Sequence, residues 1–394
     1  MGEERRSYTI IIGSKEYFSK QVATVLDERE ISYADNFVQM VQEHDDWRKR
    51  ISIEGISRTE KEDFERTNFL IIRNSDYHGI VETAHDRLGV LIEDLTTDDA
   101  EIYVHNPTML LANYLAKQQA RNEIALSQDN ETYSMPNDFH IFKEGLCSIS
   151  EKIIGQENAV NEIVRSLWYL SRVQRKKPFV VMLYGNSSIG KTETIRTISK
   201  HFFGEKVFEK HLSMFQNVSA ENYLFGNYPN RTSIGFELLE RESNLVFLDE
   251  FDKLNNYFYP VFYTLFDNTL FKDATYQADI SGLVVFLTSN YRNIDEMQKH
   301  LGFPIYYRID KFIRFDDFSS STIRKVTDIE ISYYVEGSDG NLNGEEIYAC
   351  VSPKINATGE NARTIKNKVQ QEVEQILFED AMMQNTDDRE ALTD

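Results

Sequence analysis

The sequence predicts an α/β protein with a parallel sheet in each of two parts, a smaller N-terminal domain and a larger C-terminal region. Two observations lead to this prediction. Short apolar and β-branched runs alternate with helical patterns along the chain, and such alternation is typical of parallel sheets. One apolar run is also followed directly by a glycine-rich loop at residues 185–192 that begins a helix, which is the arrangement of a phosphate-binding fold.

In the N-terminal domain, the pattern predicts a three-layer α/β arrangement. We expect strands at residues 8–12, 68–72 and 101–104, and helices at residues 16–28, 75–91 and 107–117. The segment Gly13-Ser14-Lys15 follows the first strand, where a phosphate-binding turn would lie. A single glycine is weak evidence for such a site, so a plain strand-to-helix turn is the favoured interpretation.

A polar segment at residues 128–137 separates the two parts. It lacks apolar periodicity and contains turn-forming Asn, Asp and Pro residues, which predicts a hinge and a boundary near residue 140. Beyond it we expect strands at residues 179–184, 245–248 and 283–287, and helices at residues 157–174, 260–266 and 364–384. The acidic residues 387–394 are expected to fray.

The composition excludes several classes of protein. The 394 residues include 43 Lys and Arg against 64 Asp and Glu, a formal net charge of −21, so nucleic acid and anionic membranes are not expected partners. The two cysteines, Cys147 and Cys350, stand far apart, which argues against a disulfide framework and fits a reducing cytoplasm. No apolar run reaches the roughly 18 residues of a membrane span, and the run at residues 8–12 is too short for a signal sequence. We therefore expect a soluble, cytoplasmic protein.

The glycine-rich loop matches the pattern G-x-x-x-x-G-K-[ST] directly after an apolar strand. Its residues are Gly185, Asn186, Ser187, Ser188, Ile189, Gly190, Lys191 and Thr192. Small residues let backbone N–H groups surround phosphates, Lys191 is expected to neutralise the β- and γ-phosphate oxygens, and the Thr192 hydroxyl is expected to bind Mg²⁺. The motif therefore predicts ATP and Mg²⁺ as ligands.

Two later strands end in polar residues that complete such a site. Asp249 and Glu250 end one apolar run, and we expect Asp249 to hold the magnesium shell and Glu250 to orient and polarise the attacking water. Asn290 follows the next apolar run. The carboxyl ends of parallel strands meet at one edge of a sheet, so we expect Asn290 near the γ-phosphate, where it holds the water together with Glu250.

These motifs resemble those of AAA+ ATPases and, more narrowly, of the second-module type of the Clp family. The resemblance covers about residues 145–384 and implies ATP hydrolysis. It also implies that Ile154 and Gly155 lie against the adenine. In the same way it assigns Arg308 as the finger that reaches a neighbouring subunit's nucleotide and, by a looser match, Arg363 as a sensor in the lid.

The resemblance sets the expected domain organisation and assembly. We expect a recruitment or effector domain at residues 1–130, a linker at 131–147, a large ATPase subdomain at 148–318 and a small lid subdomain with an acidic tail at 319–394. An arginine that acts on a neighbour is useful only at a subunit interface, so the resemblance implies a homo-oligomer, in this family a hexamer.

Two segments depart from the family pattern. Clp unfoldases grip polypeptide with an aromatic pore loop, but the stretch at residues 222–231 is shorter and lacks the family's tetrapeptide. Tyr228 is a candidate client contact, and packing of Tyr228 on its own loop is an equal alternative. The tripeptide 301–303 resembles a peptidase-docking tip, but it lies immediately before Arg308 with no long loop preceding it, so peptidase docking is not expected.

Two functions remain open after these observations. In the first, the N-terminal domain recruits a protein client or adaptor and the ring remodels the client. In the alternative, ATP controls an assembly that clusters the N-terminal domains without threading a client. The N-terminal sequence contains no catalytic constellation, because its histidines are too scattered to propose as ligands; they are His44, His78, His85 and His105.

Overall fold

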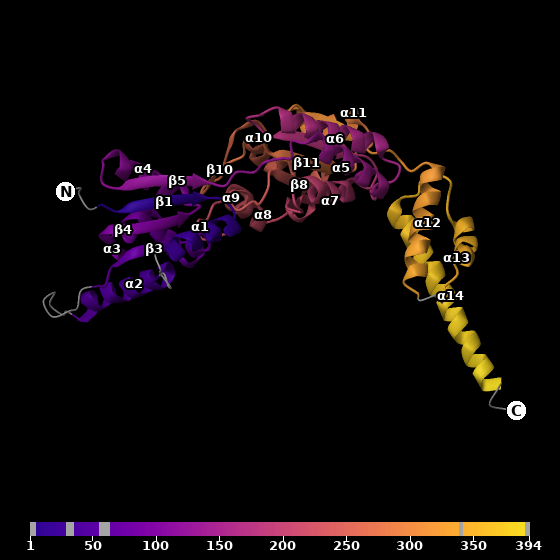
Figure 1. The fold of residues 1–394 in the computed structure, drawn as a ribbon, viewed down its shortest axis with the longest axis horizontal. Coiled ribbons are helices and arrows are strands. Elements are labelled where there is room, and N and C mark those ends of the chain that lie inside the picture. The colour runs from indigo at the N-terminus through magenta and orange to yellow at the C-terminus, as the bar shows by residue number, and fades with distance from the viewer. Residues whose placement is uncertain (1–4, 29–34, 55–63, 339–341, 391–394) are drawn as a thin grey trace.

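The computed structural model describes residues 5–28, 35–54, 64–338 and 342–390. Three parts follow one another in an elongated molecule: an N-terminal α/β domain, a central α/β module and a helical C-terminal subdomain (Figure 1). Each α/β part is built on its own five-stranded sheet, and every strand pair within these two sheets is parallel. The predicted fold class is therefore confirmed.

The N-terminal sheet lies between two helical layers and has the strand order β2-β3-β4-β1-β5. Its strands are β1 (Ser7–Ile12), β2 (Asp35–Asn36), β3 (Thr67–Ile72), β4 (Thr96–His105) and β5 (Ala125–Asn130). Helix α1 (Lys15–Glu28) packs on one face, whereas α2 (Phe37–Glu54), α3 (Leu88–Leu95) and α4 (Met109–Ala120) pack on the other. The helices that follow the adjacent strands β1 and β4 thus lie on opposite faces of the sheet.

The central sheet has the strand order β12-β6-β11-β8-β7. Its strands are β6 (Phe179–Tyr184), β7 (Phe208–His211), β8 (Leu245–Asp249), β11 (Val284–Ser289) and β12 (Lys311–Arg314). Helices α5 (Phe139–Lys152), α6 (Glu157–Arg172) and α7 (Lys191–Phe202) cover one face. The other face carries α8 (Val218–Phe225), α9 (Ile234–Leu239), α10 (Tyr259–Asp267), α11 (Ile294–Tyr306) and the hairpin β9 (Leu270–Lys272) and β10 (Gln277–Asp279).

Alternate side chains of the central strands enter two apolar cores. Val180 and Met182 of β6 belong to the core under α10 and α11, whereas Val181 and Leu183 belong to the core under α5 and α6. All four side chains are almost completely buried. A sheet with helices on both faces requires such continuous apolar strands, which explains why the strands at 179–184 and 245–248 could be predicted from the sequence.

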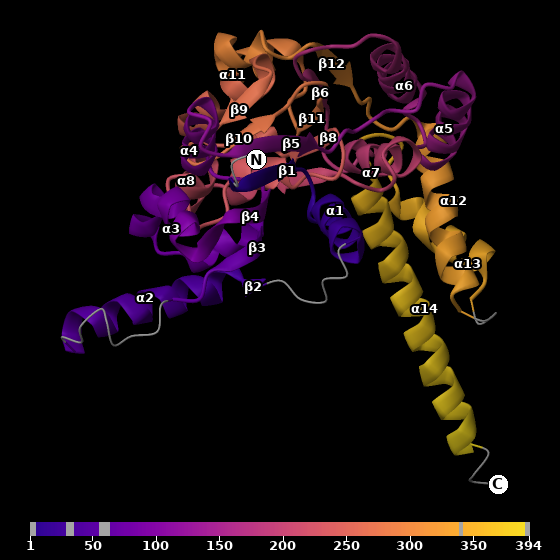
Figure 2. The same cartoon turned by 60° about the vertical axis from the view of Figure 1, so that its left-hand side comes forward.

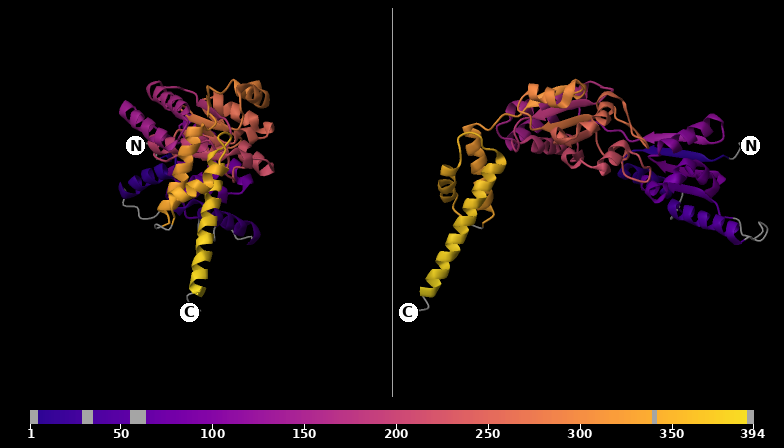
Figure 3. Two further views of the ribbon diagram at one scale, coloured as in Figure 1. Left: turned by 90° about the vertical axis from the view of Figure 1, so that its right-hand side faces the viewer. Right: turned by 180° about the vertical axis from the view of Figure 1, so that it is seen from behind.

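The C-terminal subdomain consists of α12 (Ser320–Glu336), α13 (Gly344–Val351) and α14 (Ala362–Glu390). Its packing involves Ile323 of α12, Ile347 of α13 and Val369 of α14, which are all buried. The second half of α14 extends beyond α12 and α13 and away from the central module (Figures 2 and 3). The predicted helical lid is thus present beside the central module.

One predicted helix is wrong. Residues 75–91 are expected to form a single helix, but they form two 3-10 helices, Asn74–Gly79 and Glu82–Arg87, before α3 begins at Leu88. The backbone is extended at Ile80 and Val81, which separates the two turns. Ile80 is buried at this break, so tertiary packing overrides the helical pattern.

The predicted hinge is also placed differently. Residues 128–130 are the end of β5, which pairs with β1 in register from Ala125 opposite Ser7 to Asn130 opposite Ile12. An edge strand with polar outward side chains shows no apolar periodicity, so its backbone hydrogen bonds were not visible in the sequence. Residues 139–147 of the expected linker lie in α5, and Phe142 of this helix is buried against the central module.

The last helix is longer than predicted and continues to Glu390. Residues 387–390 of the expected frayed tail are therefore helical, whereas residues 391–394 lie outside the described residues. Within the part of the chain that the structure describes, no helix is long and apolar enough to cross a bilayer.

Candidate functional site

A cleft of about 450 Å³ opens at the carboxyl edge of the central sheet. Five segments meet there: the glycine-rich loop with the start of α7, the end of β7, the end of β8, the end of β11 and the first residues of α14. The cleft brings together Lys191, Thr192, Asp249, Glu250, Asn290 and Arg363. These are six of the residues that the sequence places at a nucleotide site.

The glycine-rich loop adopts a conformation that depends on its glycines. Gly185 has φ +136°, and a Cβ atom at this position would lie 2.4 Å from the backbone oxygen of Phe315. Gly190 has φ +105° directly before α7. The glycines therefore allow the loop to turn tightly before α7, whose first N–H groups have no partner within the helix.

Lys191 is buried at the floor of the cleft. Its Nζ donates to the backbone oxygens of Gly185 at 2.8 Å and Asn186 at 2.6 Å, and lies 3.3 Å from Oδ1 of Asn290. Burial lowers the pKa of Lys191 from 10.5 to about 8, and the charges of Asp252 and Asp249 oppose this shift. A buried cation held only by carbonyl oxygens is well placed to exchange them for phosphate oxygens.

Thr192 and Asp249 form the pair expected to bind a magnesium ion. Oγ1 of Thr192 lies 3.4 Å and 3.5 Å from the two carboxylate oxygens of Asp249. Among the described residues, no group of three or more His, Cys, Asp or Glu side chains is arranged to hold a metal. One carboxylate and one hydroxyl nevertheless fit Mg²⁺, which keeps several waters and takes its other ligands from substrate phosphates.

Glu250 follows Asp249 with its backbone in the left-handed region, at φ +57° and ψ +44°. Such a backbone is uncommon for a residue other than glycine and costs of order 1–3 kcal/mol, so the surroundings must hold it. The hydroxyl of Thr288 accepts the Glu250 N–H at 2.9 Å and also bonds to the Asp249 carboxylate. Thr288 thus fixes both carboxylate residues, with the Glu250 side chain half-buried at the cleft.

The two arginines that the resemblance assigns lie in different places. Arg363 lines the cleft near the first turn of α14, where the backbone N–H of Ala362 donates to the Ser188 oxygen at 3.0 Å. Arg308 is not among the residues lining the cleft. Its Nε pairs with Asp267 at 2.7 Å and its guanidinium lies over the Tyr263 ring.

The segment expected against the adenine lies outside the cleft and contacts the glycine-rich loop through the neighbouring residue Gln156. Ile154 and Gly155 do not line the cleft, and neither do Gly185, Asn186 and Ile189. The buried side chain of Gln156 donates to the backbone oxygens of Ile189 and Asp316 and accepts from the Asp316 N–H.

The candidate client contact Tyr228 is half-buried in the turn after α8. The guanidinium of Arg231, three residues on, lies 4.9 Å from the centre of its ring. Its neighbours Asn227 and Pro229 line a cavity of about 270 Å³ together with residues of the N-terminal domain such as Thr108.

Three residues of the site were missed by the sequence interpretation. They are Gln156, Thr288 and His211, whose Nδ1 lies 3.4 Å from the Asp249 carboxylate. Thr288 lies two residues before Asn290 and Gln156 directly follows Gly155, so their closeness in sequence to predicted site residues could have indicated them. His211 comes from β7, the edge strand, and only the sheet order brings it to Asp249.

Comparisons with known proteins agree with this geometry. Residues 181–316 match the family described as ATPase family associated with various cellular activities (AAA). The AAA+ ATPase ClpV1 of Pseudomonas aeruginosa is 28% identical over 155 residues, which is 36% of this chain and 17% of that protein. The chaperone protein ClpB of Yersinia enterocolitica is 27% identical over 154 residues, again 36% of this chain and 17% of that protein.

A solved structure shares the fold. A closed-state cryo-EM reconstruction of Hsp104 with ATPγS and FITC casein has a TM-score of 0.52 at 14% sequence identity, covering 92% of this chain and 69% of that chain. The present chain spans about a sixth of the length of the curated relatives it matches. Residues 181–316 therefore match the AAA ATPase family, and this part of the chain is similar to part of ClpV1 and of ClpB.

Proposed function

We propose that this chain binds and hydrolyses ATP with Mg²⁺ at the cleft of the central module. The observation that carries the proposal is the meeting of Lys191, the Thr192–Asp249 pair and Glu250 at one edge of the sheet. Phosphoryl transfer needs positioned charge more than covalent chemistry, and these side chains supply it. Mg²⁺, held by Thr192 and Asp249, would neutralise charge on the phosphate oxygens.

Each residue has a defined task in this proposal. Lys191 leaves the oxygens of Gly185 and Asn186 and binds the β- and γ-phosphates. The Glu250 carboxylate orients and polarises the water, and the Asn290 amide holds that water on its other side. Thr288 keeps Glu250 in place through the backbone N–H, and Arg363 contacts the γ-phosphate from the lid.

We propose further that the protein works as a ring, a hexamer by resemblance to the Clp family. Arg308 is held outside its own cleft by Asp267, and a finger for a neighbour's nucleotide must lie on the outside of its own subunit. The two exposed, free cysteines fit the cytoplasmic location that we propose for this assembly.

In the first form of the proposal, the ring remodels a protein client that the N-terminal domain recruits directly or through an adaptor. This form rests on the likeness of the ATPase domain to a chaperone. The alternative is a nucleotide-controlled assembly that clusters the N-terminal domains. It is favoured by the position of Tyr228, whose ring lies against Arg231 in its own turn.

The mass of the Glu250→Gln protein in solution tests the ring. With ATP and Mg²⁺ we expect a closed assembly of about six subunits, and with ADP a smaller species, because the variant binds ATP but does not turn it over. Wild-type protein with ADP is the control. A monomer or dimer under both conditions would contradict ring assembly, and normal hydrolysis by Glu250→Gln would contradict the role of Glu250.

A mixing experiment tests Arg308, and one variant separates the two forms of the proposal. Arg308→Ala should bind ATP but lose turnover, and adding Lys191→Ala protein should restore part of the activity if the arginine serves a neighbour. Arg314→Ala, whose side chain pairs with Asp316 at the end of β12, is the matched control and should keep turnover.

Tyr228→Ala should abolish client remodelling in the first form and leave assembly intact in the alternative.

A further inference from the structure

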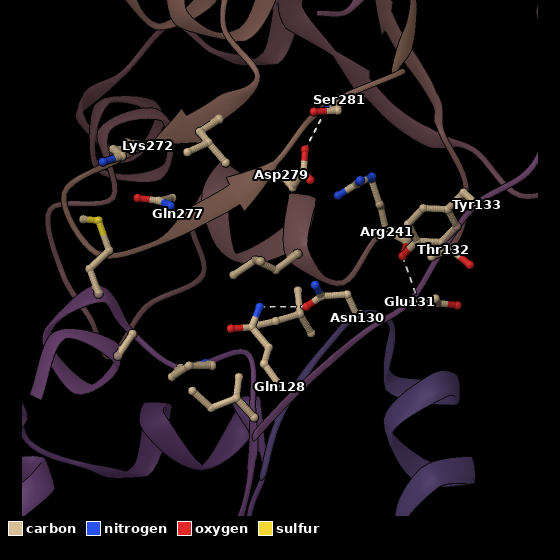
Figure 4. A pocket seen from close by; sticks show the side chains of 18 of the residues that line it. Gln128, Asn130, Glu131, Thr132, Tyr133, Arg241, Lys272, Gln277, Asp279 and Ser281 are labelled. Carbon is tan, nitrogen blue, oxygen red and sulfur yellow. Dashed lines mark hydrogen bonds between the residues drawn. The ribbon is translucent and has the colours of Figure 1, made fainter. Parts of the chain in front are cut away.

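A second cleft, of about 620 Å³, lies between the N-terminal domain and the central module (Figure 4). One wall consists of β1, β5 and the start of α4, and the opposite wall is the outer face of the β9–β10 hairpin. The segment at residues 130–133 and Arg241 close one end. The cleft is distinct from the nucleotide site, with which it shares no lining residue.

The wall on the N-terminal domain has an apolar floor bordered by amides. In the β1–β5 register, Ile10 lies opposite Gln128 and Ile12 lies opposite Asn130, and all four residues line the cleft. The side chains of Gln128 and Asn130 hydrogen-bond to each other at 2.8 Å. An apolar floor with paired amides suits a flat ring with hydrogen-bonding edges.

The hairpin wall repeats this mixture. Leu270 and Lys272 of β9 lie opposite Asp279 and Gln277 of β10, and these four side chains face the cleft. The intervening residues Phe271 and Ala278 are buried in the central module. The outer face of the hairpin is thus mainly polar, and its inner face is anchored in the central module.

Arg241 brings an incompletely satisfied cation to the end of the cleft. Its Nη1 donates to the Leu238 oxygen and its guanidinium lies 5.0 Å from the centre of the Tyr133 ring, but Nε is buried without a hydrogen-bond partner. Among the described residues, no carboxylate forms an ion pair with it. Burial lowers the pKa of the Arg241 guanidinium. Figure 4 shows this side chain extending from beside Tyr133 toward Asp279.

The nearby carboxylates of Asp279 and Glu131 oppose this lowering of the Arg241 pKa through their charge, but neither forms an ion pair with Arg241, and both accept hydrogen bonds from other groups. Glu131 accepts the Ser14 N–H at 2.6 Å and contacts the Tyr133 hydroxyl, and Asp279 accepts the Ser281 N–H at 2.8 Å. In the same wall, the buried Oδ1 of Asn244 also has no partner. A donor on Arg241 and an acceptor on Asn244 therefore await a ligand, since buried polar atoms are rarely left unpaired.

The position in the fold is also one where ligands bind. The helices after β1 and β4, which are neighbours in the sheet, pack on opposite faces, so the chain diverges at their carboxyl ends. Ligands of open α/β sheets bind at such a point. The side of α1 is filled by Glu131 and Asn106, whereas the side of α4 opens into the cleft.

We propose that this cleft binds a nucleoside monophosphate, with the phosphate on Arg241 and the edge of the base against the amides of Gln128 and Gln277. Guanidinium groups bind phosphate oxygens through paired hydrogen bonds, and Asn or Gln amides pair with the edge of adenine. The volume lies within the range of small-ligand sites. Because both walls contribute contacts, the ligand joins the N-terminal domain to the module that hydrolyses ATP.

Calorimetric titration of AMP into Lys191→Ala protein tests this site without competition from the phosphate loop. We expect one AMP per chain and at least roughly 10-fold weaker binding of adenosine, which lacks the charge-assisted contact. Arg241→Gln should weaken AMP by a similar factor and leave adenosine unchanged. Arg172→Gln is the matched control, because Arg172 also lies over an aromatic ring, that of Trp168, but far from the cleft.

A second variant, at an exposed position, tests the site without affecting the folding of the chain. Gln277 is exposed on the hairpin, so Gln277→Glu adds a negative charge to the wall without disturbing packing. It should weaken both ligands, because the amide that pairs with the base is lost, and it should weaken AMP more than adenosine, because the added charge repels the phosphate. No binding of AMP at millimolar concentration, or AMP binding that neither variant changes, would overturn the proposal. This titration involves no hydrolysis, so its outcome is independent of the function proposed for the central module.

Discussion

In each of the two parallel sheets, one strand is followed by a glycine-containing turn and a helix, but the two turns differ in what occupies them. In the central module, β6 runs into a glycine-rich turn and then α7, and the turn surrounds an open cleft. In the N-terminal domain, β1 runs into Gly13-Ser14 and then α1, but the N–H of Gly13 donates to Asn106 and that of Ser14 donates to Glu131. One turn is open to a ligand, and the other is filled by the protein's own side chains.

The difference shows what separates the proposed phosphate site from a structural turn. Both helix N-termini offer unpaired N–H groups, which attract an anion. At α1 the anion is the carboxylate of Glu131, which lies just after β5 and so ties the chain leaving the domain back to its first strand. At α7 Lys191 rests on carbonyl oxygens, and the Asp317 carboxylate contacts the loop at the side chain of Asn186.

Removing the lysine of each turn should give the largest contrast. Lys191→Ala should weaken ATP binding by about 100-fold or more, because the buried cation of the cleft is lost and each charge-assisted contact is worth roughly 1.5–3 kcal/mol. Lys15→Ala should leave ATP binding unchanged, since Lys15 is exposed and pairs with Glu240. Titration with a fluorescent ATP analogue measures both. Equal losses would mean that the two turns are not functionally distinct.

A methyl group added to the phosphate loop should give the next largest effect. Gly185→Ala places a Cβ 2.4 Å from the Phe315 oxygen at φ +136°, so we expect the free energy of unfolding to fall by about 2–4 kcal/mol. The control is Gly204→Ala, at φ +61° with no atom within 4 Å of the new Cβ, which should cost about 1 kcal/mol. Urea unfolding compares them, and a smaller loss for Gly185→Ala would show that the loop adjusts.

The buried lysine should also make ATP binding depend on pH. The pKa of Lys191 is about 8 in the free protein because burial disfavours its charge, and bound phosphates raise it. Above pH 8 the free lysine is neutral and must take up a proton to bind, so affinity should fall by up to about 10-fold per pH unit. Below pH 8 the lysine is already charged and affinity should be flat.

Calorimetry of ATP binding to Glu250→Gln protein, in two buffers of different ionisation enthalpy, measures this proton uptake. Lys191→Arg is the control, because a guanidinium stays protonated throughout this range and should flatten the profile. Constant affinity from pH 7 to 9 would contradict the lowered pKa.

The sequence predicted the parts of the site that depend on short motifs. The loop that leads to Lys191 follows one apolar strand, Asp249 ends a second and Asn290 follows a third, so the sheet brings the three residues together once its strands are parallel. The structure adds contacts that no local pattern contains. Ser14 and Glu131 are 117 residues apart, and Gln156 reaches Asp316 across 160 residues. Such pairings follow from strand order and register, which the sequence does not state.

The same reason explains the errors in the fold. The end of β5, residues 128–130, was interpreted as part of a polar hinge, because its side chains face a cleft and an exposed edge instead of a core. The predicted helix at 75–91 failed because the buried side chain of Ile80 anchors an extended break in it. Apolar periodicity reports burial against a core, so elements stabilised by backbone pairing or by contacts between domains are the ones it misses.

Neutralising the carboxylate that fills the N-terminal turn should have the smallest effect. Glu131→Gln keeps the shape but replaces charge-assisted bonds to the Ser14 N–H and the Tyr133 hydroxyl with weaker ones, and it removes the favourable interaction with the N-terminus of α1. We expect the free energy of unfolding to fall by about 1 kcal/mol, with ATP binding unchanged. Urea unfolding with and without ATP measures this, and Glu123→Gln, an exposed glutamate of the same domain, is the control. A change in ATP affinity would mean that the filled turn communicates with the open one. Loss of stability no greater than that of the control would mean that the turn does not need its internal anion, and that what separates the two turns is Lys191 alone.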